Sequence, residues 1–169
     1  MANVVPYAFK QGILKAQHDF TTVVANPGAG GAGQGTNVTG AYKLALYTYN
    51  SNTPPFDVNS TIWSAVATEV NNTAGTANYT AGGAVLSTAT VGQTGNFTTV
   101  DWADATWASA TISAGFGVLY RYDTNGANMY LVAILDFNGA KSSTNGTFQV
   151  AFPTITTGGD AILSITGNP

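Results

Sequence analysis

The chain has 169 residues with a formal net charge of −3, and only 8% of them are charged, against about 25% in average soluble proteins. Five scattered basic residues cannot form a patch that neutralises several phosphates, and the absence of cysteine excludes disulfides, thiolate metal sites and cysteine nucleophiles. Residues 1–10 lack the basic-then-apolar order of a secretory signal, and no uncharged apolar run approaches the ~20 residues needed to cross a bilayer. Neither nucleic acid nor a membrane is therefore expected as a partner.

Residues 1–26 are predicted to form an N-terminal arm. Pro6 near the start of residues 6–16, with Phe9 and Ile13 spaced to share one face, indicates a short helix, although a glycine within it weakens the prediction. The arm has more apolar side chains than a free tail would, so we expect it to dock on a neighbouring subunit or on a capsid. The members of this candidate assembly interface are Val4, Val5, Tyr7, Phe9, Ile13, Leu14 and Phe20. The alternative is that the segment folds back as an edge element of its own domain.

Residues 27–40 are predicted to form a Gly-rich linker or loop. They include a literal G-x-G-x-x-G at Gly28, Gly30 and Gly33, the pattern of dinucleotide-binding proteins. That pattern requires a helix opening at its last glycine, but residues 34–40 have the composition of a loop. A nucleotide site is therefore not expected, and the stretch is interpreted as a flexible connection.

Residues 41–169 are predicted to form one antiparallel β-sandwich domain, Ig-like or jelly-roll-like, so the protein is expected to be all-β with a short arm and one short helix. Apolar segments alternate with turn residues at the spacing of such a fold. The expected strands are 42–49, 84–91, 97–102, 106–113, 116–123, 129–137, 147–152 and 161–166. Residues 42–49 are apolar at even and odd positions, as in a central strand. In residues 59–70, apolar side chains have helical spacing behind a capping Asn59 or Ser60, which indicates the short helix.

Three Asn-Gly pairs, at 125–126, 138–139 and 145–146, lie between the predicted strands. Asn-Gly readily supplies the two positive-φ residues of a type I′ turn, whose twist suits a hairpin. We therefore expect turns at these places, and the first pair should join strands 116–123 and 129–137 as antiparallel neighbours.

Residue types that support catalysis are scarce. His18, the only histidine, has no nucleophile-elbow pattern to complete a Ser-His-Asp triad, so a lone surface histidine is expected. Asp101 and Asp104 flank one turn, where aspartates commonly accept backbone N–H bonds instead of facing each other across a substrate. Residues 123–128 offer oxygen ligands but lack the glycine placement and closing glutamate of a calcium loop. No catalytic, cofactor-binding or metal site is predicted, and the protein is not expected to be an enzyme.

Aromatic side chains are abundant. In strands they most often form core and cross-strand pairs, whereas an exposed row could bind sugars or a partner surface. We expect most of them in the core. The set includes Tyr42, Tyr47, Tyr49, Trp63, Tyr79, Trp102, Trp107, Tyr120 and Tyr122.

Six segments, in order along the chain, carry a family resemblance. They are LALYT (44–48), EVNNTAGTANYTAGGAVL (69–86), DATWASATISAGFGVLY (104–120), VAILDFNGAK (132–141), NGTFQVAFP (145–153) and ILSI (162–165). In these segments the chain resembles a widespread family of phage and prophage virion proteins. AFKQGILKAQHDF (8–20) is similar to the short opening element of that family. The Gly-rich stretch is longer than expected, and the acidic G-x-D-K of the family is altered at Asn138 and Gly139.

The resemblance implies a structural role in a virion, without a catalytic residue or a cofactor. Proteins of this kind serve as capsid decoration, cement or tail components. We expect a capsid cement or decoration protein, located on the capsid surface and assembled in the host cytoplasm. Its expected partners are the major capsid protein and its own copies, with a homotrimer favoured. The alternative is a tail-fibre or spike module that binds host carbohydrate through loop aromatics.

Overall fold

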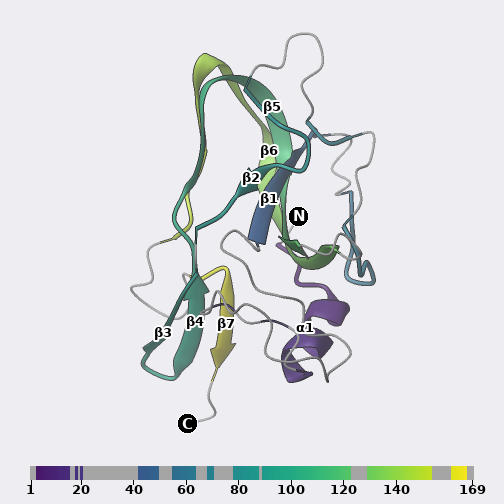
Figure 1. Cartoon of the computed structure of the whole chain (residues 1–169), viewed down its shortest axis with the longest axis vertical. Helices are drawn as coiled ribbons and strands as arrows, with labels where there is room; N and C mark the ends of the chain where they lie inside the picture. Colours follow the sequence, from purple (N-terminus) through teal and green to yellow (C-terminus); the bar gives the residue numbers. More distant parts are fainter. Residues whose placement is uncertain are drawn as a thin grey trace.

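The computed structural model describes residues 3–15, 18, 20, 42–49, 55–63, 68–70, 78–87, 89–122, 129–153 and 161–166. These residues form one helix and seven strands: α1 (Tyr7–Leu14), β1 (Tyr42–Tyr47), β2 (Ala84–Val85), β3 (Thr90–Thr94), β4 (Phe97–Asp101), β5 (Ala105–Tyr122), β6 (Met129–Val150) and β7 (Leu163–Thr166). All strand pairs are antiparallel and make two sheets, a four-stranded one in the order β2-β1-β5-β6 and a three-stranded one in the order β3-β4-β7. Figure 1 shows the larger sheet above the smaller one. The predicted all-β, sandwich-like fold is confirmed.

The two longest strands, β5 and β6, form a hairpin that bends over the core. The largest register shift lies between the pairs Ala114–Lys141 and Phe116–Asp136, where β6 has more residues than β5. An excess of residues on one strand bends it, and Figure 1 shows the two ribbons curving over together. Side chains from both sides of this shift belong to the same core cluster. The main core therefore lies inside the bend of the β5–β6 hairpin.

Two of the three predicted Asn-Gly turns are wrong. Asn138 (φ 55°), Gly139 (φ 109°) and Asn145 (φ 47°) have the expected positive φ, but they lie inside β6. Asn and Gly tolerate positive φ in a bulge as readily as in a turn, so four predicted strands merge into β5 and β6. The pair at 125–126 lies outside the described residues, but β5 and β6 on either side of it are antiparallel neighbours as predicted.

The large sheet is buried on both faces. In β1, Leu44 and Leu46 belong to the main core cluster, whereas Ala45 and Tyr47 pack with Trp63 in a second cluster. Successive strand residues point to opposite faces, so a strand covered on both sides is apolar at even and odd positions. The prediction that these residues form a central strand is confirmed, because β1 lies between β2 and β5.

The short helix predicted over residues 59–70 is wrong where the structure describes that segment. Ile62 pairs with Tyr130 of β6, and Glu69 pairs with Tyr47 of β1. The backbone hydrogen bonds that these short bridges make go to the edges of the large sheet. Pairing with a strand edge satisfies the polar backbone of both partners, and this outweighs the weak helical spacing.

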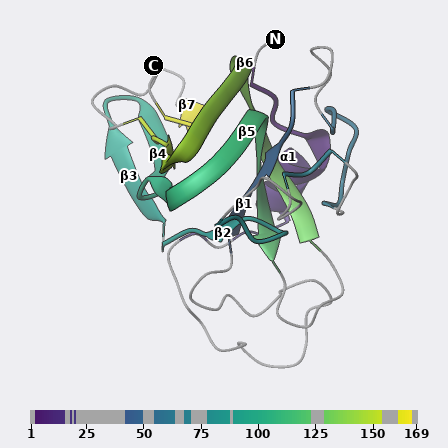
Figure 2. The same cartoon turned by 90° about the horizontal axis from the view of Figure 1, so that it is seen from above.

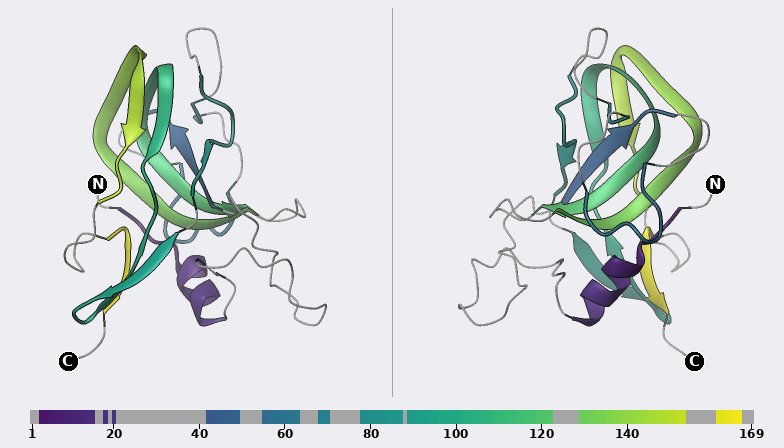
Figure 3. Two further views of the ribbon diagram at one scale, coloured as in Figure 1. Left: turned by 60° about the vertical axis from the view of Figure 1, so that its left-hand side comes forward. Right: turned by 90° about the vertical axis from the view of Figure 1, so that its right-hand side faces the viewer.

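The helix and the small sheet lie on different sides of the β5–β6 hairpin, as Figure 2 shows. α1 packs against β6 and places Phe9 in the main core cluster. The small sheet extends away from the large one (Figures 1 and 3). The molecule therefore presents two features outside its main body, the outer side of α1 and the edges of the small sheet.

Candidate functional site

The single glutamate of the chain, Glu69, is buried in a hydrogen-bonded cluster with tyrosines. Its Oε1 atom accepts hydrogen bonds from the Tyr79 hydroxyl, at 3.0 Å, and from the Gly82 backbone N–H. The Tyr79 hydroxyl accepts a bond from the Leu46 N–H at 2.9 Å, and the Tyr120 hydroxyl donates to the Gly82 carbonyl at 2.7 Å. These bonds tie the loop before β2 to β1 and β5.

The glutamate cluster is structural. Burial, with an added contribution from the Glu69 charge, raises the pKa of the Tyr47, Tyr79 and Tyr120 hydroxyls above their usual value of 10.0. A general acid or base needs a pKa near the working pH and contact with substrate, and these buried hydroxyls have neither. Sequence reasoning missed this cluster, because its one signal is a lone glutamate in a stretch of small and apolar residues.

His18 is enclosed by aromatic rings, so the predicted lone surface histidine is wrong. Its ring centre lies 4.6 Å from that of Phe9, 6.2 Å from that of Phe20 and 6.5 Å from that of Tyr130. Burial, with a smaller contribution from the Arg121 charge, lowers the pKa of His18 to about 3. The imidazole is therefore neutral at physiological pH and serves the packing of the aromatic cluster.

The half-buried His18 predicts a pH-dependent stability. In the unfolded chain His18 titrates near 6.5, so between pH 6.5 and about 3 the unfolded state binds a proton that the folded state does not. The free energy of unfolding should therefore fall as the pH falls through this window, by up to about 1.4 kcal/mol per pH unit from this group. Urea unfolding near neutrality and near pH 4 should show a larger loss for the wild type than for His18→Gln. Equal losses in the two proteins would contradict the assignment.

Asp104 holds the end of β6 in place. Its Oδ1 atom accepts a hydrogen bond from the Phe152 N–H and its Oδ2 atom from the Gln149 side-chain amide, both at 2.9 Å. This is the structural use that the sequence predicted for an aspartate at a turn. The described part of the chain contains no group of three or more His, Cys, Asp or Glu residues that could hold a metal ion. Within the same residues, no helix has both the length and the apolarity to span a membrane.

Five of the seven candidate assembly residues pack on the protein's own sheet. They are Val4, Val5, Phe9, Ile13 and Phe20. Phe9 is only 2% exposed, and Val4 exchanges backbone hydrogen bonds of 2.9 and 2.8 Å with Ile134 of β6. The prediction of a separate docking arm is therefore wrong for these residues, and the segment is an edge element of its own fold. The reason is that β6 offers an edge to pair with and the core offers an apolar surface to cover.

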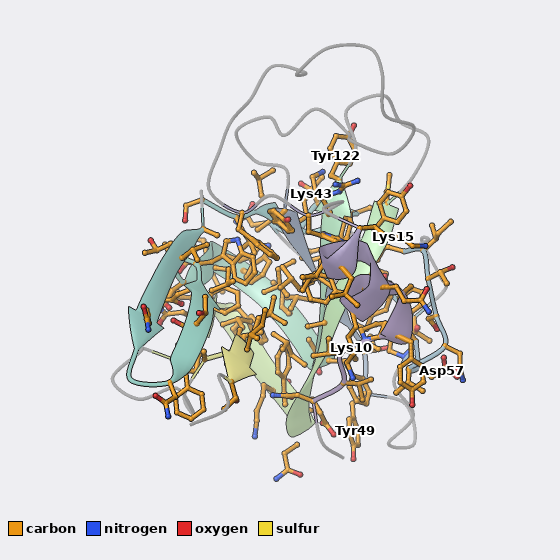
Figure 4. All side chains as sticks on the ribbon, turned by 90° about the horizontal axis from the view of Figure 1, so that it is seen from below. Lys10, Lys15, Lys43, Tyr49, Asp57 and Tyr122 are labelled. Atoms are coloured by element: carbon orange, nitrogen blue, oxygen red, sulfur yellow. The ribbon has the colours of Figure 1, made fainter. Side chains whose placement is uncertain are left out.

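Tyr7 and Leu14 are the two candidate residues that remain exposed, at 56% and 88%. They are seven residues apart on α1 and so lie on the same side of the helix. The Tyr7 N–H donates to the Val58 carbonyl at 2.9 Å, which places the exposed Val58 next to Tyr7. Lys10 lies with its ammonium 5.3 Å from the centre of the Tyr7 ring, and Figure 4 labels it and Lys15 on the helix. We call the apolar set Tyr7, Leu14 and Val58 the α1 face.

Alanine substitutions on the buried and on the exposed side of α1 should differ in their effect on the free energy of unfolding. Phe9→Ala should lower the free energy of unfolding by about 3 kcal/mol or more, because it leaves a cavity in the main core. Leu14→Ala is the matched control on the same helix, and its effect should stay within about 0.5 kcal/mol because the side chain is solvated. Urea unfolding followed by circular dichroism measures both. Equal effects would mean that residues 3–15 are not part of the core.

A groove of about 500 Å³ lies along β6. Its lining includes Leu135, Phe137, Lys141, Phe148 and Gln149. The groove combines two aromatic rings with polar and charged side chains, a composition compatible with a polar organic ligand. Its acidic and basic groups do not form any of the catalytic arrangements considered above.

No family model matches the chain, and neither a curated protein nor a solved structure matches it. The family resemblance therefore remains a prediction from the sequence segments that carry it.

Proposed function

We propose that the protein is a structural component of a bacteriophage particle, a capsid cement or decoration protein that binds the outer shell. The observation that carries this proposal is the α1 face. α1 is anchored by Phe9 in the core while Tyr7 and Leu14 point outward. A helix held rigidly from behind can present apolar side chains to a partner without a further ordering cost. Lys10 and Lys15 beside the apolar set favour an acidic rim on that partner.

The mechanism of stabilisation is mass action. A protein that binds the assembled lattice, and not the free capsid subunits, lowers the free energy of the lattice by an amount set by its concentration and its affinity. The low charge of the chain suits close packing of many copies, because little repulsion acts between them. The partners in this proposal are the major capsid protein and further copies of the chain, with a trimer favoured, at the surface of the virion.

The alternative of a tail-fibre or spike module would use exposed aromatic side chains to bind host carbohydrate. All three tryptophans of the chain, Trp63, Trp102 and Trp107, are buried. Tryptophan rings stacked in the core cannot stack on a sugar, so this observation supports the cement proposal over the carbohydrate-binding one.

Binding to expanded shells of the phage that encodes the chain tests the proposal. Leu14→Ser should weaken co-sedimentation with the shells about tenfold or more, because apolar side chains at the centre of an interface contribute most of its affinity. Val85→Ser removes an exposed apolar side chain from β2 and should bind like the wild type. Unchanged binding of Leu14→Ser would rule out the α1 face as the contact.

Particles that lack the protein provide the second part of this test. They should keep their shape but release DNA at a lower temperature than complete particles. Particles that are equally heat-stable without the protein, but no longer adsorb to cells, would support the tail-fibre alternative instead.

A further inference from the structure

The two sheets differ in whether short segments outside the strands pair with them. Short segments pair with the large sheet through three isolated bridges, two on its edge strand β6 and one at the end of β1. These are Val4 with Ile134, Ile62 with Tyr130, and Tyr47 with Glu69. In the described residues, no segment pairs with the outer edge of β3 or of β7 in the small sheet. Among the residues that the structure describes, both outer strands of the small sheet therefore have an unpaired outer edge.

These two edges lack the features that usually prevent strand pairing. β3 reads TVGQT and β7 reads LSIT, with no charged residue and no proline. Native edge strands commonly carry lysine, proline or a bulge to block association. Val91 in β3 and Ile165 in β7 are instead 40% and 59% exposed. Open edges flanked by exposed β-branched side chains are typical of sites that add a further strand.

The exposed side chains of the two edges lie on one face of the small sheet. Val91 is paired with Val100, and Ile165 is paired with Thr98. Paired residues share a face, and so do residues two positions apart in one strand such as Thr98 and Val100. This face therefore carries an exposed β-branched side chain at each edge, Val91 and Ile165, while Val100 between them packs against the main core.

We propose that the outer edge of β3 in one copy of this protein pairs with the outer edge of β7 in the next copy, which joins the copies into a closed ring. Each copy has both edges, so each edge is used once and a head-to-tail ring leaves none open. β3 and β7 are both antiparallel to β4, so they run in the same direction and extend one continuous sheet across the contact as a parallel pair.

A second copy fits these edges better than a charged partner does. Asp101, at the end of β4, is the one charged residue in the three strands. Two such surfaces meet without burying an unpaired charge, whereas a strongly charged partner would lose solvation without an ion pair in return. This contact uses other residues than the α1 face, so it can be tested separately from shell binding.

The molecular mass in solution tests the ring. The wild type should be an oligomer in sedimentation velocity across a concentration series. Val91→Lys and Ile165→Lys should each shift it to the monomer, because a lysine beside the edge blocks pairing. Val85→Lys, at an exposed position in the large sheet, is the matched control and should keep the wild-type mass. Circular dichroism checks that each variant keeps its strand content.

Mixing the two variants separates a ring from a two-fold contact. Val91→Lys keeps an intact β7 edge and Ile165→Lys keeps an intact β3 edge, so an equimolar mixture should form a dimer although each alone is a monomer. A wild type that stays monomeric, a single variant that keeps the wild-type mass, or a mixture that stays monomeric would each overturn the proposal.

Cross-linking gives a readout that does not depend on a disruptive variant. The chain has no cysteine, so Val91→Cys combined with Ile165→Cys introduces the only two thiols. A short bismaleimide should link the copies into covalent oligomers that end at one ring size. Cross-linking confined to the monomer would overturn the proposal even if a lysine variant failed to fold.

Discussion

Replacing Gly83 with alanine is expected to destabilise the protein severely. Gly83 has φ +76°, and a Cβ atom at this position would lie 1.9 Å from the carbonyl oxygen of Leu44. That oxygen belongs to β1, which is paired on both sides, so the backbone cannot move away. The clash and the strained φ together should cost about 4 kcal/mol or more, a large part of the 5–15 kcal/mol that stabilises a typical domain. Urea unfolding followed by circular dichroism measures this loss.

Gly95→Ala is the matched control for this variant. Gly95 has φ +57° in the turn between β3 and β4, and a Cβ atom there would meet nothing within 4 Å. It tests the cost of positive φ alone, which is about 1–2 kcal/mol. If Gly83→Ala lost no more stability than Gly95→Ala, the close approach of the loop before β2 to β1 would be refuted.

Glu69→Ala is expected to destabilise the protein about as much as Phe9→Ala. The variant leaves two buried donors, the Tyr79 hydroxyl and the Gly82 N–H, without their acceptor. An unsatisfied buried donor costs about 1–3 kcal/mol, so the free energy of unfolding should fall by about 3 kcal/mol or more. Glu69→Gln keeps one side-chain oxygen as an acceptor and should lose clearly less.

A double-mutant cycle with Tyr79→Phe isolates the pair. If Glu69 and Tyr79 act through their hydrogen bond, the two losses should not add, and the coupling should amount to about 0.5–3 kcal/mol. Additive losses, or a Glu69→Ala variant within about 0.5 kcal/mol of the wild type, would show that the cluster does not hold the loop.

Elements whose signal is local were predicted well. The apolar residues at both even and odd positions of β1 depend on neighbours in sequence, and the prediction of this central strand follows from them. Elements that depend on a distant partner were not. Residues 59–70 have helical spacing, but Ile62 pairs with β6 and Glu69 pairs with β1 in isolated β-bridges. Asn138 and Gly139 have turn chemistry, but pairing with β5 makes them a bulge.

The candidate site shows the same division. The apolar content of residues 1–26 predicts an association surface, but the sequence does not tell which of these side chains pack in the protein's own core. Phe9 packs in the main core and Val4 packs on the sheet, whereas Tyr7 and Leu14 are exposed to solvent. The position of α1 against β6 decides which side chains are buried. Helical spacing in the sequence groups residues by side of the helix, but it does not show which side packs against the sheet.

The sequence by itself determined the β class of the fold, the scarcity of catalytic residue types and the low charge of the surface. These properties follow from composition and from periodicities of two residues, which act between neighbours in the chain. The tertiary structure decided that Glu69, Tyr79 and Gly82 form one buried cluster and that His18 is enclosed by aromatic rings. It also decided that β3 and β7 are the outer strands of the small sheet. Those features depend on contacts between distant segments, and burial and strand pairing exist only once the chain has folded.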